Sequence, residues 1–181
     1  MNNRHRTLLV TALALAGLVL LGSACRTYPD QPQIITFVLV RHAEVAPDGT
    51  KDPPLSEAGI ARTHALAASL PQYTSAAYAT SYRRTQQTAQ AAADSNHAWK
   101  VPVTTYDANL PAEEFARQLR MKHLKGTVVV VGHSNTIPAI ASALCRCTVA
   151  PMREDEFDRR ISISIDTLVN RGATEFKESR Y

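Results

Sequence analysis

Apolar and polar residues alternate along this chain in blocks that predict strands and helices in turn. Residues 34–40 form an apolar run rich in β-branched side chains, which predicts a buried strand. The next block has apolar residues at helical spacing and ends at Pro71, and Ser56 is a suitable N-cap for that helix. The same pattern predicts further strands over 76–79, 101–106, 128–131, 161–165 and 173–177, and further helices over 83–93, 111–124 and 136–144.

This order of elements predicts the fold class. Strands that alternate with helices are typical of a parallel sheet with helices on both faces. We therefore expect an α/β fold, a three-layer α/β/α sandwich with a mainly parallel central sheet. Pro102 lies in the strand-like stretch 101–106 and has no N–H to donate, so this strand is expected at an edge. Residues 34–181 suit one domain of ordinary size.

The first residues have a different composition from this domain. A basic start over 1–6 is followed by an apolar run over 7–21 and by small residues, which is typical of a secretory signal peptide. The run is shorter than the ~18 residues expected of a membrane span. We expect residues 1–24 to be a signal peptide and residues 25–33 to be a tether. The alternative is a retained N-terminal anchor.

Cys25 follows this segment directly and leaves two export routes open. Cleavage before Cys25 would expose a cysteine that can be acylated, as in bacterial lipoproteins. The residue three places earlier is Gly22, where such motifs usually have Leu, and Gly22 with Ala24 equally suits ordinary signal peptidase. The chain is therefore expected in the periplasm of a bacterium, either soluble or anchored to the membrane through lipid on Cys25.

Charge and cysteine content exclude some functions. The net charge is +4, and part of the positive charge lies in the expected signal peptide. No basic block interleaved with aromatic residues is present, so nucleic acid is not an expected partner. One residue separates Cys145 from Cys147, and a bridge over so short a loop is strained. An exported location would permit a disulfide, but we expect two small buried or half-buried residues there, and no metal site.

Two predicted strands end in residues that can bind phosphate. Arg41 and His42 follow the strand at 34–40, and His133 follows the strand at 128–131. In open α/β sheets, ligands bind at the carboxyl ends of the strands. Two histidines and an arginine from neighbouring strand ends would form a phosphate site with a histidine nucleophile.

Four segments resemble, in order, the motifs of the histidine phosphatase superfamily, also called the phosphoglycerate mutase-like family. They are Arg41-His42-Ala43-Glu44, Leu55-Ser56-Glu57-Ala58-Gly59, Thr80-Ser81-Tyr82-Arg83-Arg84-Thr85-Gln86-Gln87-Thr88-Ala89 and Gly132-His133-Ser134. The resemblance implies the fold of that family and a phosphoric monoester hydrolase that needs no cofactor and no metal. The chain lacks the long insertions that cap the site in larger members, so we expect a small, cap-less, exported member.

The resemblance also implies roles for individual residues. His42 would be the nucleophile that forms a covalent phosphohistidine, and His133 would complete a positive pocket. Arg41 and Arg84 would bind phosphate oxygens, because the planar guanidinium bonds two oxygens at once. Arg83 is adjacent to Arg84, but neighbouring helix residues point ~100° apart, so Arg83 is expected on the surface.

The general acid is the least determined of these assignments. Many members use a carboxylate after the strand that precedes the second histidine strand, and here Asp107 has that position. A turn or cap would equally explain an Asp two residues before Asn109. Glu44 and Glu113 are the other candidates. Some small members lack this acid and act on substrates with better leaving groups, such as phosphohistidine.

The function expected from the sequence is metal-independent hydrolysis of phosphate monoesters, or of phosphohistidine, through an intermediate on His42. The substrate would be a phosphorylated small molecule, a glycan or a phosphoprotein. Two alternatives remain: a catalytically silent module that binds phosphate or sugar phosphate at the cell envelope, and a phosphotransferase of the phosphoglycerate mutase type. The mutase is disfavoured by the small size and the expected export.

Overall fold

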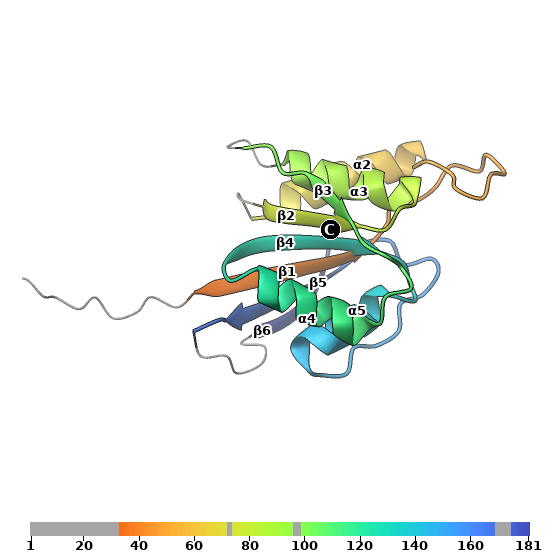
Figure 1. Cartoon of the computed structure of the whole chain (residues 1–181). Helices are drawn as coiled ribbons and strands as arrows, with labels where there is room; N and C mark the ends of the chain where they lie inside the picture. Colours follow the sequence, from red (N-terminus) through yellow and green to blue (C-terminus); the bar gives the residue numbers. More distant parts are fainter. Residues whose placement is uncertain (1–32, 72–73, 96–98, 169–174) are drawn as a thin grey trace, which may run out of the picture. The chain divides into compact units, whose positions relative to one another are not determined.

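A computed structural model describes residues 33–71, 74–95, 99–168 and 175–181 of the chain (Figure 1). The predicted signal peptide, residues 1–24, and almost all of the predicted tether lie outside these ranges. The strands are β1 (Ile34–Arg41), β2 (Thr74–Ala79), β3 (Val103–Thr105), β4 (Gly126–Gly132), β5 (Arg159–Asp166) and β6 (Glu175–Arg180). The helices are α2 (Glu57–Ser69), α3 (Arg83–Asp94), α4 (Ala112–Lys122) and α5 (Ile137–Cys145).

The strands form one sheet in the order β3-β2-β4-β1-β5-β6. The first four of these pair in parallel, whereas β5 is antiparallel to β1 and β6 is antiparallel to β5. The predicted α/β class is confirmed. The prediction that the Pro102 strand lies at an edge is also confirmed, since β3 ends the sheet.

Helices cover both faces of this sheet (Figure 1). Alternate strand residues point to opposite faces, and the two apolar clusters follow this rule. Phe37 and Leu39 of β1 pack in the cluster that contains residues of α4 and α5. Val38 and Val40 pack instead with Leu66 of α2 and with alanines of α3. Because β1 and β4 are buried on both faces, they read as continuous apolar runs in the sequence.

The expectation for the two cysteines is wrong. Cys145 and Cys147 are joined in a disulfide with their Cα atoms 5.2 Å apart. The reason is the residue between them: Arg146 has a left-handed backbone with φ of 57° and ends α5 as its C-cap. This conformation turns the chain back on itself and brings the two sulfurs together.

Candidate active site

The register of β1 and β4 places the two histidines side by side. Arg41 is paired with Gly132 at the carboxyl ends of these strands, and the backbone N–H of His42 donates to the carbonyl of Gly132 at 3.0 Å. The ring centroids of His42 and His133 are 5.4 Å apart. The imidazole rings of His42 and His133 are therefore neighbours at the carboxyl ends of β1 and β4.

Both histidines line a cavity of about 600 Å³. It is lined by Arg41, His42, Tyr82, Arg84, Ala108, Asn109, His133, Ser134, Asn135, Thr136 and Glu154. The structure thus brings together Arg41, His42, Arg84 and His133, which the sequence placed in one site. Asp107, the fifth predicted site residue, is not part of the lining.

The orientation of His42 leaves one ring nitrogen available. Its Nδ1 lies 2.8 Å from the carbonyl oxygen of Ala43. A carbonyl can only accept, so Nδ1 carries the proton and Nε2 keeps its lone pair. The N–H of Ala43 donates to the hydroxyl of Thr88 at 3.1 Å, which fixes this segment against α3. Thr88 is part of the third motif of the sequence, but the sequence did not indicate this contact with the His42 segment.

The second motif holds the same segment from the other side. The carbonyl of Glu44 accepts from the backbone N–H of Ser56 at 2.9 Å. Gly59 packs against this carbonyl so closely that a Cβ atom there would lie 2.1 Å from the oxygen. A side chain at Gly59 would therefore push the start of α2 away from the segment that carries His42.

His133 is oriented by buried hydroxyl groups. Its Nε2 lies 3.1 Å from the Oγ1 of Thr80, and this hydroxyl contacts the Oγ1 of Thr85 at 2.8 Å. The rings of His133 and Tyr82 are also perpendicular to each other, with centroids 5.3 Å apart. His133 is therefore held by the residues around the start of α3, although it lies at the end of β4.

Both histidines are uncharged at neutral pH. Burial lowers the pKa of His42 to about 4, and the positive charges of Arg41 and Arg84 act in the same direction. Burial also lowers the pKa of His133 to about 4, again with help from Arg84 and Arg41. A neutral imidazole with a free Nε2 is the form of histidine that can attack phosphorus.

These shifts predict how the rings titrate. We expect His42 and His133 to bind protons only near pH 4, and to be neutral from about pH 5 upward, where an ordinary histidine of pKa ~6.5 is still largely protonated. Replacement of Arg84 by Gln should raise both pKa values, because its positive charge opposes protonation. NMR titration of the histidine ring signals measures this, with Arg83→Gln as control. Wild-type rings that titrate near pH 6.5 would contradict the shifts.

The two adjacent arginines point to different surroundings. Arg84 lines the cavity, is 18% exposed, and its guanidinium carbon lies 4.3 Å from the ring centroid of Tyr82. Arg83 is exposed and is not part of the lining. Asp52 contacts both residues, through the backbone N–H of Arg83 at 2.9 Å and the Nη1 of Arg84 at 3.6 Å.

Arg41 is buried and largely occupied by protein groups. Its Nη1 donates to the carbonyls of Arg153 and Glu154 at 3.1 and 2.6 Å, and its Nη2 donates to a carboxylate oxygen of Glu154 at 3.0 Å. The guanidinium carbon lies 4.2 Å from the ring centroid of Phe157. Nε is buried and has no hydrogen-bond partner among the described residues. Arginine has five N–H donors, so Nε–H and one N–H of Nη2 are left without a partner among the described residues.

The carboxylates considered as general acid lie outside this cavity. Asp107 accepts at Oδ1 from the backbone N–H and the side-chain amide of Asn109, at 2.9 and 3.2 Å. Its side chain is thus engaged in an Asx turn, and it lines a different cavity. Glu44 is paired with Arg62, and Glu113 lies on α4. The geometry supports the turn for Asp107 and gives it no contact with the histidines.

Replacement of Asp107 by Asn is therefore expected to change little. An amide oxygen can still accept from Asn109, so the turn persists, and no proton donor is removed from the cavity. The rates for an alkyl phosphate and for nitrophenyl phosphate should both stay within about threefold of wild type, since ordinary surface changes have small effects. A selective loss on the alkyl phosphate would restore Asp107 as the acid, because protonation matters most for a poor leaving group.

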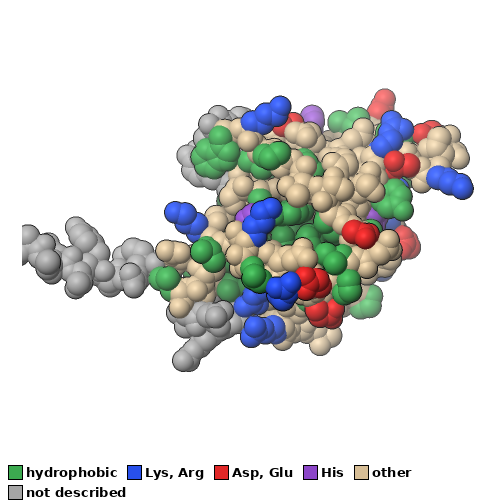
Figure 2. Space-filling view, in the orientation of Figure 1, with side chains coloured by type: hydrophobic (Ala, Val, Ile, Leu, Met, Phe, Trp, Pro, Cys, Tyr) green, Lys and Arg blue, Asp and Glu red, His purple; other side chains and the backbone are tan. Residues whose placement is uncertain are grey.

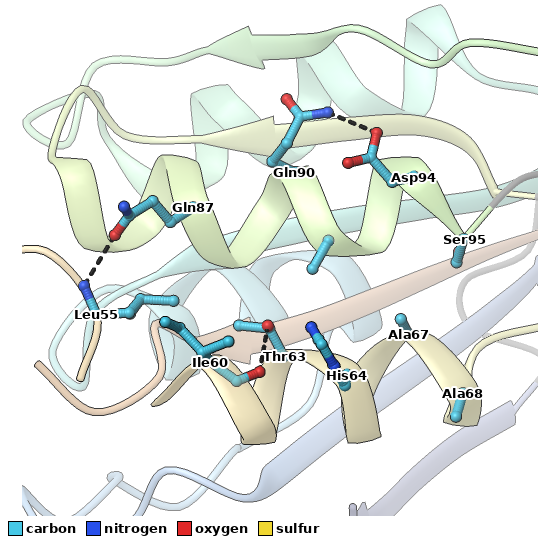
Figure 3. Close-up of a pocket in the computed structure, with 11 residues that line it drawn as sticks. Leu55, Ile60, Thr63, His64, Ala67, Ala68, Gln87, Gln90, Asp94 and Ser95 are labelled. Atoms are coloured by element: carbon cyan, nitrogen blue, oxygen red, sulfur yellow. Dashed lines mark hydrogen bonds between the residues drawn. The ribbon is translucent and has the colours of Figure 1, made fainter. Parts of the chain in front are cut away.

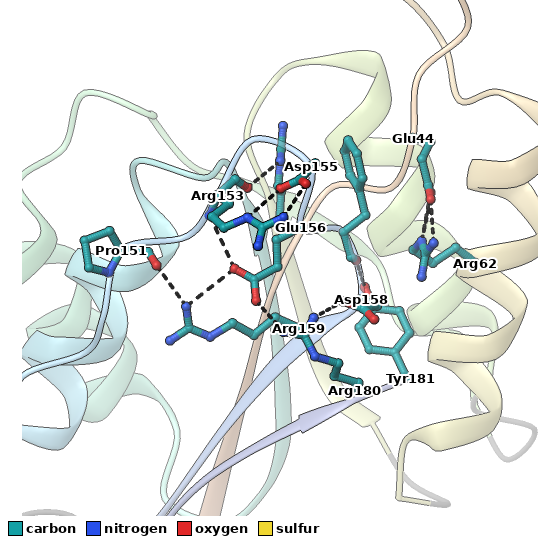
Figure 4. A network of polar contacts seen from close by, with 12 residues as sticks. Glu44, Arg62, Pro151, Arg153, Asp155, Glu156, Asp158, Arg159, Arg180 and Tyr181 are labelled. Atoms are coloured by element: carbon teal, nitrogen blue, oxygen red, sulfur yellow. Dashed lines mark hydrogen bonds and ion pairs between the residues drawn. The ribbon is translucent and has the colours of Figure 1, made fainter.

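Glu154 is the charged residue of the cavity lining that the sequence did not indicate. It lies in the segment between α5 and β5, which has no helical or strand periodicity. Arg159, the first residue of β5, is buried and donates to the carbonyls of Ala150 and Pro151 in this segment, both at 3.2 Å. Glu156 lies 3.8 Å from Arg159 and 2.9 Å from Arg180, so ion pairs fix the segment on β5 and β6 (Figure 4).

A second cavity, of about 580 Å³, lies between α2 and α3 (Figure 3). Its walls include the apolar residues Leu55, Ile60 and Ala67, and the one histidine there is His64. It contains none of the predicted site residues. In the space-filling view, apolar, basic and acidic side chains are mixed over the visible face of the molecule (Figure 2).

The described residues include no group of three or more His, Cys, Asp or Glu side chains placed to hold a metal ion. Within the same part of the chain, every helix is too short or too polar to cross a bilayer.

Comparison with known proteins finds similarity to histidine phosphatases, both in sequence and in fold. Residues 37–110 match the model of the histidine phosphatase superfamily, branch 1. No match is found among curated proteins. A protein described as a phosphohistidine phosphatase SixA from Nakamurella multipartitia superimposes with a TM-score of 0.61 at 23% identity, over 83% of this chain and 98% of that one.

Two other solved structures have the same fold. The protein histidine phosphatase SixA in complex with tungstate gives a TM-score of 0.57 at 16% identity, over 78% of this chain and 95% of its own. A mycobacterial glucosyl-3-phosphoglycerate phosphatase gives 0.59 at 16% identity, over 82% and 99%. At these identities the likeness shows the shared fold.

The family match and the shared fold both support a phosphatase enzyme. Residues 37–110 are similar to the histidine phosphatase superfamily, and the solved structures show the same fold over most of the chain.

Proposed function

We propose that the chain hydrolyses phosphate monoesters, or phosphohistidine, through a covalent phosphohistidine on His42 and without a metal ion. The observation that carries the proposal is the neutral His42, whose unprotonated Nε2 lies in a cavity lined by two arginines. A phosphoryl group needs a nucleophile and positive donors around its equatorial oxygens, and this cavity holds both.

In the proposed first step, the phosphoryl group is bound by Arg84, by the remaining donors of Arg41 and by His133. Nε2 of His42 attacks phosphorus, the bond from phosphorus to the leaving atom breaks, and the leaving group departs with the electron pair. In the second step, water attacks phosphorus, the bond to Nε2 breaks, and phosphate is released. His42 then returns to its starting form.

The leaving group determines which substrates react fastest. Glu154 is the one acidic residue among the described lining residues, and its pKa is lowered, mainly by the hydrogen bond from Ser134. It is therefore ionised and has no proton to donate at neutral pH. Leaving groups that depart without protonation, such as phenolates or imidazole, are expected to be favoured over alkoxides. This supports the phosphohistidine substrate suggested by the SixA neighbours.

The test is hydrolysis of nitrophenyl phosphate by the purified chain, with and without chelator. We expect turnover that is unchanged by chelator and inhibited competitively by vanadate. Loss of activity on chelation, restored by a divalent ion, would contradict the metal-free mechanism. Binding of vanadate without any turnover would favour the silent phosphate-binding module.

Export remains a proposal that rests on the first 25 residues. We expect cleavage next to Cys25 and a mature chain beyond the inner membrane. Intact-mass analysis of the membrane and soluble fractions decides between the routes, because a lipid-modified chain begins at Cys25 and a secreted chain has a free N-terminus nearby. A cytoplasmic chain that still begins at Met1 would contradict both.

A further inference from the structure

Glu154 places a negative charge in a cavity that is proposed to bind the negatively charged phosphate. The cavity has two arginines and two neutral histidines to receive a dianion, and the other described lining residues are uncharged. A carboxylate beside them repels the phosphoryl group that they attract. The phosphate alone therefore does not account for a carboxylate in this cavity, whereas a part of the substrate other than the phosphate could.

The geometry of Glu154 leaves room for a ligand. One carboxylate oxygen accepts from the hydroxyl of Ser134 at 2.6 Å, and the other accepts from the Nη2 of Arg41 at 3.0 Å. The side chain is nevertheless 83% exposed. An ionised carboxylate has about four acceptor positions, so about two remain unused in this residue of the cavity lining.

Two ordinary roles explain this carboxylate less well. It is not needed to hold Arg41, because the carbonyls of Arg153 and Glu154 bind its Nη1 and the ring of Phe157 covers its guanidinium. It is not suited to act as general acid, because Ser134 and Arg41 stabilise its ionised form. What remains is its negative charge, which is exposed in the lining of the cavity that would hold the phosphate.

We propose that Glu154 is a specificity-determining residue that selects phosphorylated compounds whose leaving group carries a positively charged nitrogen close to the phosphate. The phosphate would contact Arg41 and Arg84, and the cation would lie against the open acceptor positions of Glu154. This inference rests on the proposed phosphatase function and names the substrate class of the same site.

The experiment uses a pair of aryl phosphates that differ in one charged group. The first is 2-(aminomethyl)phenyl phosphate and the second is 2-ethylphenyl phosphate, which has a methyl group where the first has an ammonium. Both release a phenolate, so neither depends on a general acid. The ratio of their kcat/KM values is measured for the wild type and for Glu154→Gln. The control is Asp155→Asn, which removes a neighbouring exposed carboxylate that pairs with Arg153 and lies outside the cavity lining.

We expect Glu154→Gln to lower the ratio of charged to uncharged substrate roughly tenfold, as for the loss of one charge-assisted hydrogen bond. Asp155→Asn should keep the wild-type ratio. If both substrates slow equally, Glu154 only positions Arg41, and the proposal is wrong. If both become equally faster, the carboxylate merely competes with phosphate, and the proposal is again wrong.

Nitrophenyl phosphate separates this inference from the proposed function. If the wild type fails to hydrolyse it, the phosphatase proposal fails. Calorimetric dissociation constants for the same two aryl phosphates then test the inference without turnover. A tighter wild-type Kd for the aminomethyl compound that is lost in Glu154→Gln supports the inference. Equal Kd values for the two compounds refute it.

Discussion

Replacement of His42 by Ala is expected to abolish turnover, with a loss of roughly 10⁴-fold or more in kcat, as found when a covalent nucleophile is removed. The reason is that no other described side chain of the cavity has the same geometry. His42 has a proton on Nδ1 that is bound by the Ala43 carbonyl, and a free Nε2. His133 instead uses its Nε2 in contact with Thr80.

The measurement combines steady-state rates with trapping of the intermediate. Wild-type enzyme mixed with substrate and quenched in base should carry acid-labile phosphate on His42. The variant should carry none and should keep its thermal unfolding midpoint within a few degrees of wild type. An active Ala variant would assign the nucleophile to another residue, and failure to trap phosphate on the wild type would favour direct attack by water.

Much of the fold follows from the sequence because the strands of this sheet are buried on two faces. Such strands need continuous apolar runs, and residues 34–40 and 128–131 have them. The two histidines come directly after these runs, so their proximity follows once the strands are neighbours in the sheet. The short strand β3 was predicted too long, because the flanking residues of Val103–Thr105 leave the sheet edge.

The parts of the site that could not be predicted depend on side-chain direction or on a loop path. Asp107 does follow β3 as expected, but its carboxylate accepts a hydrogen bond from Asn109 two residues later, and Asp107 is not part of the cavity lining. Glu154 reaches the cavity because Arg159, on β5, binds the carbonyls of a segment without periodicity. No pattern in the sequence predicts the hydrogen bond between Asp107 and Asn109 or the contacts of Arg159 with the segment that carries Glu154.

Replacement of Arg84 by Ala is expected to lower kcat/KM by roughly 10²- to 10³-fold, the typical effect of removing one preorganised donor from the transition state. Arg84 lines the cavity, and the ring of Tyr82 restrains its guanidinium group. Arg83 is the matched control, since it is the neighbouring residue, has the same chemistry and is exposed. Arg83→Ala should keep the wild-type rate within about threefold, as surface changes usually do.

Arg84→Lys refines this comparison. A lysine keeps the positive charge but loses the planar fork that bonds two oxygens at once. If the charge alone matters, Lys should restore most of the rate. If bidentate binding matters, as we expect for a phosphoryl group with three equatorial oxygens, Lys should remain well below wild type. A loss in Arg83→Ala that equals the loss in Arg84→Ala would show that the start of α3 acts as a general positive field, without a specific contact from Arg84.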